Sequence, residues 1–426
     1  MTHTLYICYF GLREPLVQTQ VLPYLREIMK GGVKVSLLTF EPDFKNKWTA
    51  EQIEIEKKKL AGENIDWHCL AYHKRPSAPA TLYDVLIGTF YASRLIRREK
   101  IDVLHARVHT PAMMGAIARK LTRRKPKLLF DIRGFFPEEY TDAGVWKENG
   151  WLYKSVKKIE KWLFKESDGF VVLTEKAREI LFPESAETGF DKFQRPVEVI
   201  PCCVDLKRFE VANDTSRMEM RRKYNLEKRR VIVYVGSFGG WYMTEEMADF
   251  FGTAKMQDDS TFALVLTQSD AEMVAALLIK RGLSENDFLI KKVTPAEIPL
   301  YLSASDIAIS FIKACYSKLS SSPTKIAEYL ASGVPIITNR GVGDVAEMIE
   351  ENQVGAVIED FTTQSYLNAL QKVAEMKVLD EKCRQTAEQK FDLEKVGGAK
   401  YRLLYNKLLD GNYVKEDVEE NRKISN

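Results

Sequence analysis

The sequence has few cysteines and no long apolar run, and each absence excludes a class of protein. The six cysteines among 426 residues show neither a paired spacing nor a zinc-binding pattern, which is typical of a reducing compartment. No apolar run approaches the roughly 20 residues that span a bilayer, and the N-terminus lacks the basic and apolar regions of a signal peptide. The sequence therefore predicts a cytoplasmic protein.

The sequence also lacks a large net charge, which argues against nucleic acid as the main partner. The net charge is +3 at pH 7, yet eleven basic and two acidic residues lie between positions 94 and 127. A helix expected over residues 151–166 adds five lysines beside aromatic and aliphatic side chains. Two interpretations stay open for these segments: a peripheral contact with anionic lipids at the inner face of the plasma membrane, or a solvated helix surface.

Length and strand pattern predict two α/β domains. The chain is about twice as long as a typical domain, and its 45% hydrophobic content suffices for two cores. Apolar strands over residues 5–10 and 33–39 flank a helix over residues 16–30, which is one Rossmann-like βαβ unit. We place the boundary near Phe209, giving domains over residues 1–209 and 210–392. The polar tail from Asn412 is expected to be mobile.

A further helix, expected over residues 81–100, carries apolar side chains at helical spacing and ends in arginines. The apolar residues are Leu82, Val85, Leu86, Phe90 and Leu95, and the arginines are Arg94, Arg97 and Arg98.

The most informative stretch covers residues 320–339 of the second domain. Ser322 is a favoured N-cap and Pro323 is tolerated at the first helical position, so a helix should begin here. The free amides of Thr324, Lys325 and Ile326 would then form an anion site at the helix N-terminus. Lys325 adds a charge suited to phosphate, and Glu328 offers two acceptor oxygens to a diol, so the stretch predicts a nucleotide site. The alternative is an ordinary capped helix with an ion-paired Glu328.

A second polar cluster follows a strand expected over residues 127–133. An acid, an arginine and a glycine at a strand end are costly to bury, so Asp131, Arg133 and Gly134 should be paired with one another or face a polar ligand. A strand over residues 101–107 should bring Arg107 and the nearby His109 to the same carboxyl edge. Two alternatives stay open: a structural pair between Asp131 and Arg133, and a capping or packing role for His109.

The stretch Pro-Thr-Lys-x-x-Glu-Tyr-Leu-Ala-x-Gly-x-Pro, residues 323–335, resembles the donor-site signature of family 4 of the glycosyltransferases. The resemblance implies an α/β fold of the GT-B type, in which two Rossmann-like domains face each other across a deep cleft. It also implies that the helix at about 393–426 returns to the first domain. In this family the residues that match Pro323, Thr324 and Lys325 bind the donor phosphates, and the residue that matches Glu328 binds ribose.

The stretch Asp131-Ile-Arg-Gly-Phe-Phe-Pro-Glu-Glu-Tyr140 resembles the Asp-x-Arg-Gly-x-x-x-x-Glu block of a bacterial subgroup that assembles polysaccharides and surface glycans. This resemblance implies an acceptor side formed by Gly11, Arg107, Gly134 and Glu138. It implies catalytic roles for His109, Arg133 and Lys325. Further donor-binding residues implied by the family are Gly236, Ser237, Trp241 and the backbone of Val293.

Two departures from the family pattern concern charge at the donor site. Many relatives carry a second glutamate eight residues before the one that matches Glu328, and this chain has Ser320 there. Many also place an arginine and a lysine after the first strand of the second domain, where this chain has Trp241 and Tyr242. Lys325, Arg133 or the helix N-terminus should therefore carry more of the charge neutralisation.

The predicted function is transfer of a sugar from a nucleotide-diphosphate sugar to a glycan or lipid-linked acceptor. The resemblance implies that the anomeric configuration is retained. No Asp-x-Asp metal clamp is present, so we expect no metal and no cofactor besides the donor. The glycines after residue 235 do not follow the Gly-x-Gly-x-x-Gly spacing, which argues against a nicotinamide dehydrogenase. Two alternatives remain, a nucleotide-sugar epimerase of the same fold and a non-catalytic nucleotide-sugar-binding protein.

Overall fold

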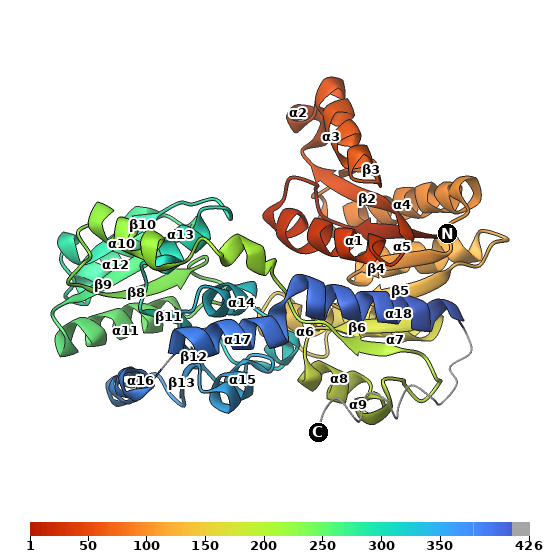
Figure 1. Ribbon diagram of the computed structural model, residues 1–426. Helices are drawn as coiled ribbons and strands as arrows, with labels where there is room; N and C mark the ends of the chain where they lie inside the picture. Colours follow the sequence, from red (N-terminus) through yellow and green to blue (C-terminus); the bar gives the residue numbers. More distant parts are fainter. Residues whose placement is uncertain (378, 411–426) are drawn as a thin grey trace. The chain divides into compact units, whose positions relative to one another are not determined.

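The computed structural model describes residues 1–377 and 379–410, and they form two compact units (Figure 1). The predicted mobile tail from Asn412 lies outside the described residues, as does the end of the predicted C-terminal helix. The first unit contains Met1–Ile200 and the segment from Gly397, and the second contains Pro201–Val396. No helix among the described residues is both long and apolar enough to cross a membrane.

The first unit is built on a seven-stranded parallel sheet with the order β3-β2-β1-β4-β5-β6-β7. The central strands are continuous apolar runs, as expected for a sheet that is covered on both faces. The strand order reverses between β1 and β4, and ligands of such sheets bind at the carboxyl ends of the strands at this point. The strands are β1 Thr2–Cys8, β2 Val33–Pro42, β3 Ile65–Tyr72, β4 Val103–Arg107, β5 Lys127–Asp131, β6 Gly169–Val172 and β7 Val197–Val199.

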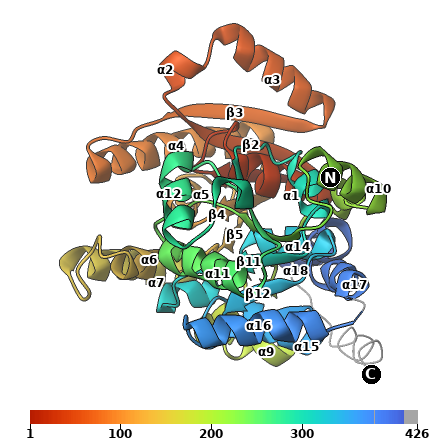
Figure 2. The same cartoon turned by 90° about the vertical axis from the view of Figure 1, so that its left-hand side faces the viewer.

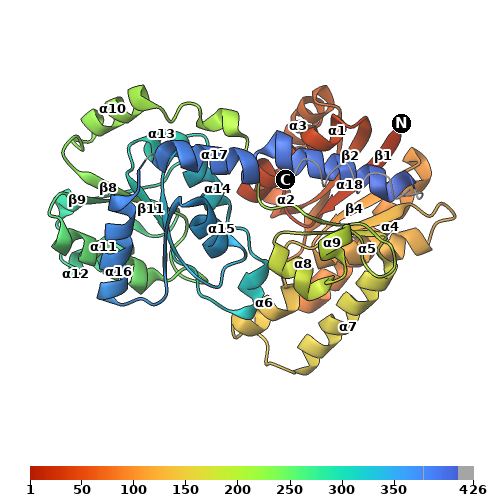
Figure 3. The same ribbon diagram turned by 60° about the horizontal axis from the view of Figure 1, so that its bottom comes forward.

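Helices cover both faces of this sheet. The chain moves outward from β1 to β3 and then returns to β4, so right-handed crossovers place α1 on one face and α4, α5 and α7 on the other. Neighbouring helices of this layer pack on each other, α4 on α5 and α5 on α7, while α18 packs on α1 (Figure 3). Helix α3 packs along β3 (Figure 2). The helices are α1 Leu22–Met29, α2 Phe44–Lys47, α3 Ala50–Gly62, α4 Ser77–Glu99, α5 His109–Lys120, α6 Phe136–Asp142, α7 Trp151–Glu166, α8 Glu175–Leu181, α9 Ser185–Thr188 and α18 Ala399–Asp410.

Helix α18 is fixed to the first unit by buried tyrosines. The Tyr401 hydroxyl donates to Asp131 Oδ2 at 3.1 Å. The Tyr405 hydroxyl lies 2.9 Å from Thr4 Oγ1 and 3.0 Å from His105 Nδ1. Because all of these groups are buried, their polar atoms must be paired inside the protein, and the helix is therefore an integral part of this unit.

The second unit has a six-stranded parallel sheet with the order β10-β9-β8-β11-β12-β13. Two apolar clusters pack on its two faces, one including α14 and α17 and the other including α11 and α16. The strands are β8 Arg230–Val235, β9 Thr261–Leu266, β10 Phe288–Lys291, β11 Ile307–Ser310, β12 Ile336–Asn339 and β13 Gly355–Ile358. The helices are α10 Asp214–Lys223, α11 Thr244–Gln257, α12 Ala271–Lys280, α13 Ile298–Ser303, α14 Thr324–Ala331, α15 Val345–Asn352, α16 Thr363–Glu375 and α17 Leu379–Phe391.

The boundary between the units differs from the predicted one near Phe209. The chain passes from one unit to the other after Ile200 and returns after Val396. Val204 and Phe209 are buried in the core of the second unit, together with residues of β8 and α14. A charged stretch over residues 211–230 follows this crossing, and the exposed helix α10 lies in it. This stretch therefore belongs to the second unit.

We predict that Gly355→Ala destabilises the second unit by about 3 kcal/mol, because overpacking a buried strand has this order of cost. A Cβ at Gly355 would lie 1.9 Å from the Ile336 carbonyl oxygen in the neighbouring strand β12. Urea unfolding followed by circular dichroism measures the change. Gly62→Ala is the control, since nothing lies within 4 Å of a Cβ there. Equal unfolding midpoints for the two variants would contradict the packing described.

Candidate functional site

Helix α14 begins at the predicted stretch, but its first turn differs from the predicted one. Pro323 is the N-cap residue, and no side chain caps the helix. Ser322 was predicted as the cap, but its hydroxyl instead accepts a hydrogen bond from the Cys202 amide at 3.0 Å. The Ile326 amide donates to the Pro323 carbonyl at 3.0 Å and is therefore occupied. The predicted anion site is thus reduced to the amides of Thr324 and Lys325, to which no described residue offers an acceptor.

Lys325 is held at the centre of the site by aromatic rings. Its side chain is buried, and its Nζ lies 4.3 Å from the Tyr234 ring centroid and 4.1 Å from that of Tyr242. Its Nζ is also 2.6 Å from the position a Cβ would take at Gly236, so only glycine fits there. Burial lowers the pKa of the Lys325 ammonium to about 7, and the Glu328 charge opposes this shift only in part. A desolvated ammonium of this kind is suited to an anionic ligand.

Glu328 is buried one turn after Lys325. Burial raises the pKa of its carboxyl to about 7, against the opposing charges of Arg208 and Lys325. None of the described residues donates a hydrogen bond to this carboxylate or lies within ion-pair distance of it. The structure therefore does not contain the ion pair that the capped-helix alternative requires, and the carboxylate oxygens remain available to hydroxyl groups.

The loop after β8 supplies the other predicted donor residues of this unit. The Ser237 carbonyl accepts from the Tyr234 hydroxyl at 2.6 Å, and the Trp241 carbonyl accepts from the Lys313 amide at 2.8 Å. These bonds fix the loop beside Lys325. Val293 follows β10, and its carbonyl accepts from Gln268 Nε2 at 3.0 Å. Its amide is therefore the backbone group that remains for the predicted contact with a base.

Sequence reasoning missed Lys318, a second lysine at this site. Lys318 lies on the short helical segment Tyr316–Ser320 just before α14, and its side chain is buried. Its Nζ lies 4.0 Å from the Trp241 ring centroid. Many relatives have an arginine and a lysine where this chain has Trp241 and Tyr242. Each of these aromatic rings contacts a lysine from another segment. The sequence signal that could have identified Lys318 is its position two residues before the predicted anion-binding stretch. Ser320, from the same segment, donates to the Ser317 carbonyl at 2.8 Å.

The first unit brings two of its predicted residues together around one carboxylate. Arg107 and Asp131 end the adjacent strands β4 and β5 and face each other in register. Arg107 Nη1 lies 3.7 Å from Asp131 Oδ2, Arg133 Nη1 lies 3.6 Å from Asp131 Oδ1, and His105 Nε2 lies 3.6 Å from Oδ2. Burial raises the pKa of the Asp131 carboxyl, but Arg133, His105 and Arg107 outweigh it and hold the pKa at about 2.

In this cluster two guanidinium groups lie within ion-pair distance of one carboxylate. Arg107 and Arg133 share the single ionised carboxylate of Asp131, and burial lowers the pKa of His105, which favours its neutral form. The predicted structural pair between Asp131 and Arg133 is therefore present, and Arg107 shares the same carboxylate at the carboxyl edge of the sheet.

The other predicted acceptor-side residues are bound to their own neighbours. His109 begins α5, stacks on Phe136, and its Nε2 lies 3.1 Å from Glu160 Oε1. Glu138 accepts from the Tyr153 hydroxyl and from Lys157 Nζ, each at 3.0 Å. These pairs join α5 and α6 to α7, as the packing alternative for His109 requires.

Two glycines of the acceptor side are used by the backbone. The Gly11 amide donates to Glu14 Oε1 at 3.0 Å, and a Cβ at Gly11 would lie 2.6 Å from Pro42 Cδ. The Gly134 carbonyl accepts from the Phe136 amide at 3.0 Å. Both positions therefore shape loops that follow strands of the first sheet.

Among the described residues, one group of side chains has the spacing of a metal site. His3, Asp66 and Glu99 lie at the amino ends of their strands or the end of α4, away from the carboxyl edge. The two ring nitrogens of His3 are already engaged, one 3.0 Å from the Glu99 carbonyl and the other 2.9 Å from Ser36 Oγ. Asp66 pairs with Lys34 at 2.9 Å. The cluster is thus satisfied as it stands, and the expectation of a metal-free site stays a prediction.

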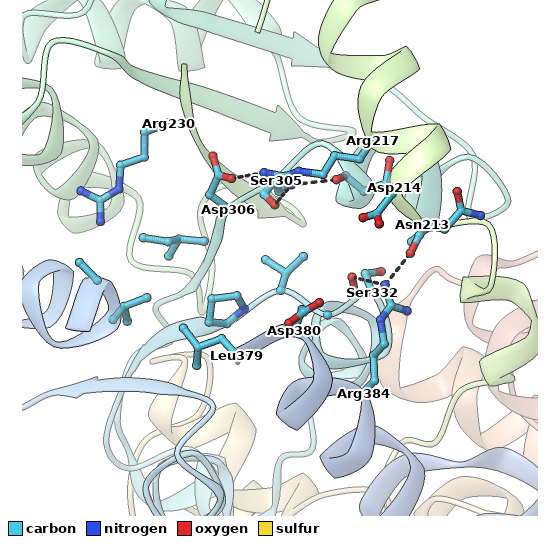
Figure 4. A pocket seen from close by; sticks show the side chains of 18 residues that line it. Asn213, Asp214, Arg217, Arg230, Ser305, Asp306, Ser332, Leu379, Asp380 and Arg384 are labelled. Atoms are coloured by element: carbon cyan, nitrogen blue, oxygen red, sulfur yellow. Dashed lines mark hydrogen bonds and ion pairs between the residues drawn. The ribbon is translucent and has the colours of Figure 1, made fainter. Parts of the chain in front are cut away.

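The second unit has a hollow of about 500 Å³ at the other end of α14 (Figure 4). It lies at the amino ends of β8 and β11, whereas Lys325 and Gly236 lie toward the carboxyl ends. Its arginines have structural partners: Arg217 binds Asp306, and Arg384 donates to the carbonyls of Ala331 and Ser332 at 2.9 and 3.0 Å. Arg384 therefore caps the C-terminus of α14, and we assign the hollow no ligand.

Two known sequence families match the chain, one in each unit. The family described as "Glycosyltransferase Family 4" matches residues 17–208, and that described as "Glycosyl transferases group 1" matches residues 216–390. The chain belongs to the family 4 glycosyltransferases. It is a transferase enzyme that uses a nucleotide-sugar donor, and the resemblance inferred from residues 323–335 is confirmed.

Individual relatives of the transferase support this assignment. The UDP-Gal:alpha-D-GlcNAc-diphosphoundecaprenol alpha-1,3-galactosyltransferase of Escherichia coli is 25% identical over 319 residues, covering 71% of this chain and 74% of the relative. A glycosyltransferase structure from Rickettsia africae gives a TM-score of 0.68 at 16% identity over 96% of this chain and 99% of that one. The HepE structure from Anabaena with UDP and glucose gives 0.64 at 15% identity over 95% and 100%. The predicted GT-B class of fold is confirmed.

We predict that Glu328→Gln weakens binding of a nucleoside diphosphate about tenfold, as expected for the loss of hydrogen bonds to a charged group. The same change should raise the free energy of unfolding of the ligand-free transferase at pH 8 by on the order of 2 kcal/mol. The folded protein keeps the Glu328 proton up to about pH 7, whereas the unfolded chain releases it at lower pH, so ionisation at pH 8 costs stability.

Calorimetric titration and urea unfolding measure the two effects of Glu328→Gln. Glu351→Gln, at an exposed position of α15, is the control and should change neither. A less stable Glu328→Gln protein with unchanged affinity would show that the carboxylate is structural.

We predict that nucleoside diphosphate binding takes up a proton at pH 8. The Lys325 ammonium must be charged to bind a diphosphate, and its pKa in the ligand-free protein is about 7. The dissociation constant should therefore rise roughly tenfold per pH unit above this value. Titrations in two buffers of different ionisation enthalpy, in a Glu328→Gln background, measure the proton uptake. Lys325→Met should abolish it, and uptake that persists in this variant would assign the proton elsewhere.

Proposed function

We propose that this transferase moves a sugar from a UDP-sugar to a lipid-linked glycan, with retention of the anomeric configuration, in the assembly of a bacterial polysaccharide or another glycoconjugate. The observation that carries the donor half is the pair of buried ionisable groups at the start of α14, to which no described residue offers an ion-pair partner. Lys325 and Glu328 are separated by one helical turn, as a diphosphate and a ribose diol require. The names of the HepE complex and of the galactosyltransferase from Escherichia coli support UDP as the nucleotide.

The chemical step in this proposal is neutralisation of the leaving diphosphate. Negative charge grows on the phosphate oxygens as the bond to the sugar breaks. In this proposal the amides of Thr324 and Lys325 and the ammonium groups of Lys325 and Lys318 stabilise that charge. Glu328 accepts hydrogen bonds from the ribose hydroxyls, and the Val293 amide contacts the base. The leaving phosphate takes the proton of the attacking hydroxyl, so the step requires no carboxylate base.

The acceptor half of the proposal rests on the charge of the first unit. Arg107 and Arg133 lie beside Asp131 at the carboxyl edge of the sheet, and guanidinium groups at this edge suit an anionic group of the acceptor. The galactosyltransferase from Escherichia coli is named for an acceptor that carries a diphosphate between sugar and lipid. A diphosphate-linked lipid would supply that anion here. Such an acceptor is held in a membrane, so peripheral contact with the anionic inner face of the plasma membrane is part of the proposal.

Incubation with UDP-galactose, UDP-glucose or UDP-N-acetylglucosamine and a short-chain prenyl diphosphate sugar tests this function. Mass spectrometry should show the acceptor extended by one sugar, and NMR should show a new bond of the donor's anomeric configuration. Lys318→Ala should lower kcat/KM about a hundredfold, as loss of one preorganised donor does. Lys313→Ala, which removes an exposed lysine, should not. Interconversion of the UDP-sugars would indicate an epimerase, and binding without turnover would indicate a non-catalytic protein.

A further inference from the structure

Helix α4 turns its large apolar side chains toward solvent. Leu82 and Leu86 are each 59% exposed and Phe90 is 66% exposed, while Tyr83 and Ile87 are 52% and 38% exposed. Spacings of three and four residues place all five on one face of the helix. Of the apolar residues recognised in the sequence of this helix, only Val85 and Leu95 are buried. The prediction of a helix was therefore correct, but its apolar residues lie on two different faces, one exposed and one buried.

The face of α4 that packs on the protein combines the apolar residues Val85, Leu95 and Ile96 with small and polar residues. Asp84, Thr89 and Ser93 are buried there. Asp84 accepts from the Tyr9 hydroxyl at 2.7 Å and from the His73 amide at 2.9 Å. A Cβ at Gly88 would lie 2.6 Å from Met114 Sδ in α5, so the two helices are in close contact at this point. These interactions fix the rotation of α4, and the helix cannot turn to bury its leucines without breaking them.

The exposed apolar face lies between two groups of cations. Lys74 and Arg75 are exposed just before the helix, and Arg94, Arg97 and Arg98 are exposed on its last turns. Among the exposed described residues from His73 to Arg98, none is acidic. At the end of α5, the neighbouring helix, Lys120 and further basic residues are also exposed. We call the face formed by Leu82, Tyr83, Leu86, Ile87 and Phe90, with these five flanking cations, the α4 face.

The charges of the α4 face argue against a second copy of this chain as its occupant. Both ends of the face are basic, so either a parallel or an antiparallel pairing of two α4 helices would place cations against cations. An anionic lipid leaflet fits both parts of the face. Its headgroups match the cations at the two ends, and its hydrocarbon boundary accepts the leucines and aromatic rings between them.

We propose that the α4 face docks on an anionic membrane surface, with Leu82, Leu86 and Phe90 entering the boundary between headgroups and acyl chains. The choice of a lipid surface rests on the proposed function, because a lipid-linked acceptor is held in such a membrane. The helix lies in the plane of the membrane, with its cations at the level of the headgroups. The α4 face thereby brings the first unit, which carries Arg107 and Arg133, to the surface in which the acceptor is embedded.

Vesicle co-sedimentation of the full-length protein tests the α4 face. We expect strong binding to vesicles of equal parts phosphatidylglycerol and phosphatidylcholine, little binding to phosphatidylcholine alone, and weakening with salt. Replacing Arg94, Arg97 and Arg98 by Gln should lower the partition coefficient on the order of a hundredfold. The triple variant Leu82→Gln, Leu86→Gln, Phe90→Gln should reduce it at least about tenfold. The control changes the exposed apolar residues Met218, Met256 and Ile279 of the second unit to Gln and should bind like wild type.

The outcomes of this experiment separate the membrane proposal from the proposed function. Sugar transfer to a water-soluble acceptor without vesicles should be the same for wild type and the apolar α4 variant. If that variant still transfers sugar and still binds vesicles like wild type, the membrane proposal is wrong and the function stands. If wild type binds neither vesicle, or if light scattering shows a dimer that the variant loses, the α4 face has another occupant. Vesicle binding that depends on α4, in a protein that transfers no sugar, would support the α4 face and contradict the function.

Discussion

The second unit depends on one constraint, the burial of charged groups at the start of α14 without a countercharge at ion-pair distance. Tyr329, the residue after Glu328, makes this arrangement rigid. Its hydroxyl accepts from the Val235 amide at 2.8 Å and lies 3.4 Å from the Ile309 carbonyl, so α14 is bonded to both β8 and β11. The helix start therefore cannot move outward to hydrate Lys325. The cost of desolvating the ammonium is built into the ligand-free state, and the diphosphate of the proposed donor would remove it.

The sequence predicted α14 well because the determinants of this element are local. The helix was expected to begin at residues 322–323, and the structure begins it at Thr324 and ends it at Ala331, with Gly333 in a left-handed conformation. The cap was wrong because Ser322 bonds to Cys202, which is 120 positions away in the sequence. Lys318 was missed for a similar reason, since its significance comes from the Trp241 ring on another loop. Local patterns predict helices, but side-chain partners from distant segments decide which groups remain free.

The same distinction explains the acceptor side. The sequence indicated that Asp131 and Arg133 are paired or face a ligand, and the structure shows that the pairing is real and includes a second arginine. The cluster around Asp131 also contains Arg107, from the adjacent strand, and Tyr401, which comes 270 positions after Asp131 in the chain. His109 illustrates the opposite outcome. A capping or packing role for this residue was one of the alternatives. Its partner, Glu160 of α7, is 51 positions later in the chain, so no local pattern around His109 indicates the pair.

Two parts of this chain break the rule that apolar groups are buried and charges are exposed, and they do so in opposite senses. At α14 a lysine and a glutamate are buried without an ion-pair partner among the described residues, and on α4 leucines and a phenylalanine are exposed. Each arrangement is costly in the isolated protein, and in each case neighbouring contacts hold it in place: Tyr329 and Gly236 at the first, Asp84 and Gly88 at the second. Sequences that are otherwise consistent tend to depart from such rules at functional sites. In the proposed function a diphosphate compensates the first departure, and in the proposed docking a lipid surface compensates the second, so each cost corresponds to one ligand that the proposals assign.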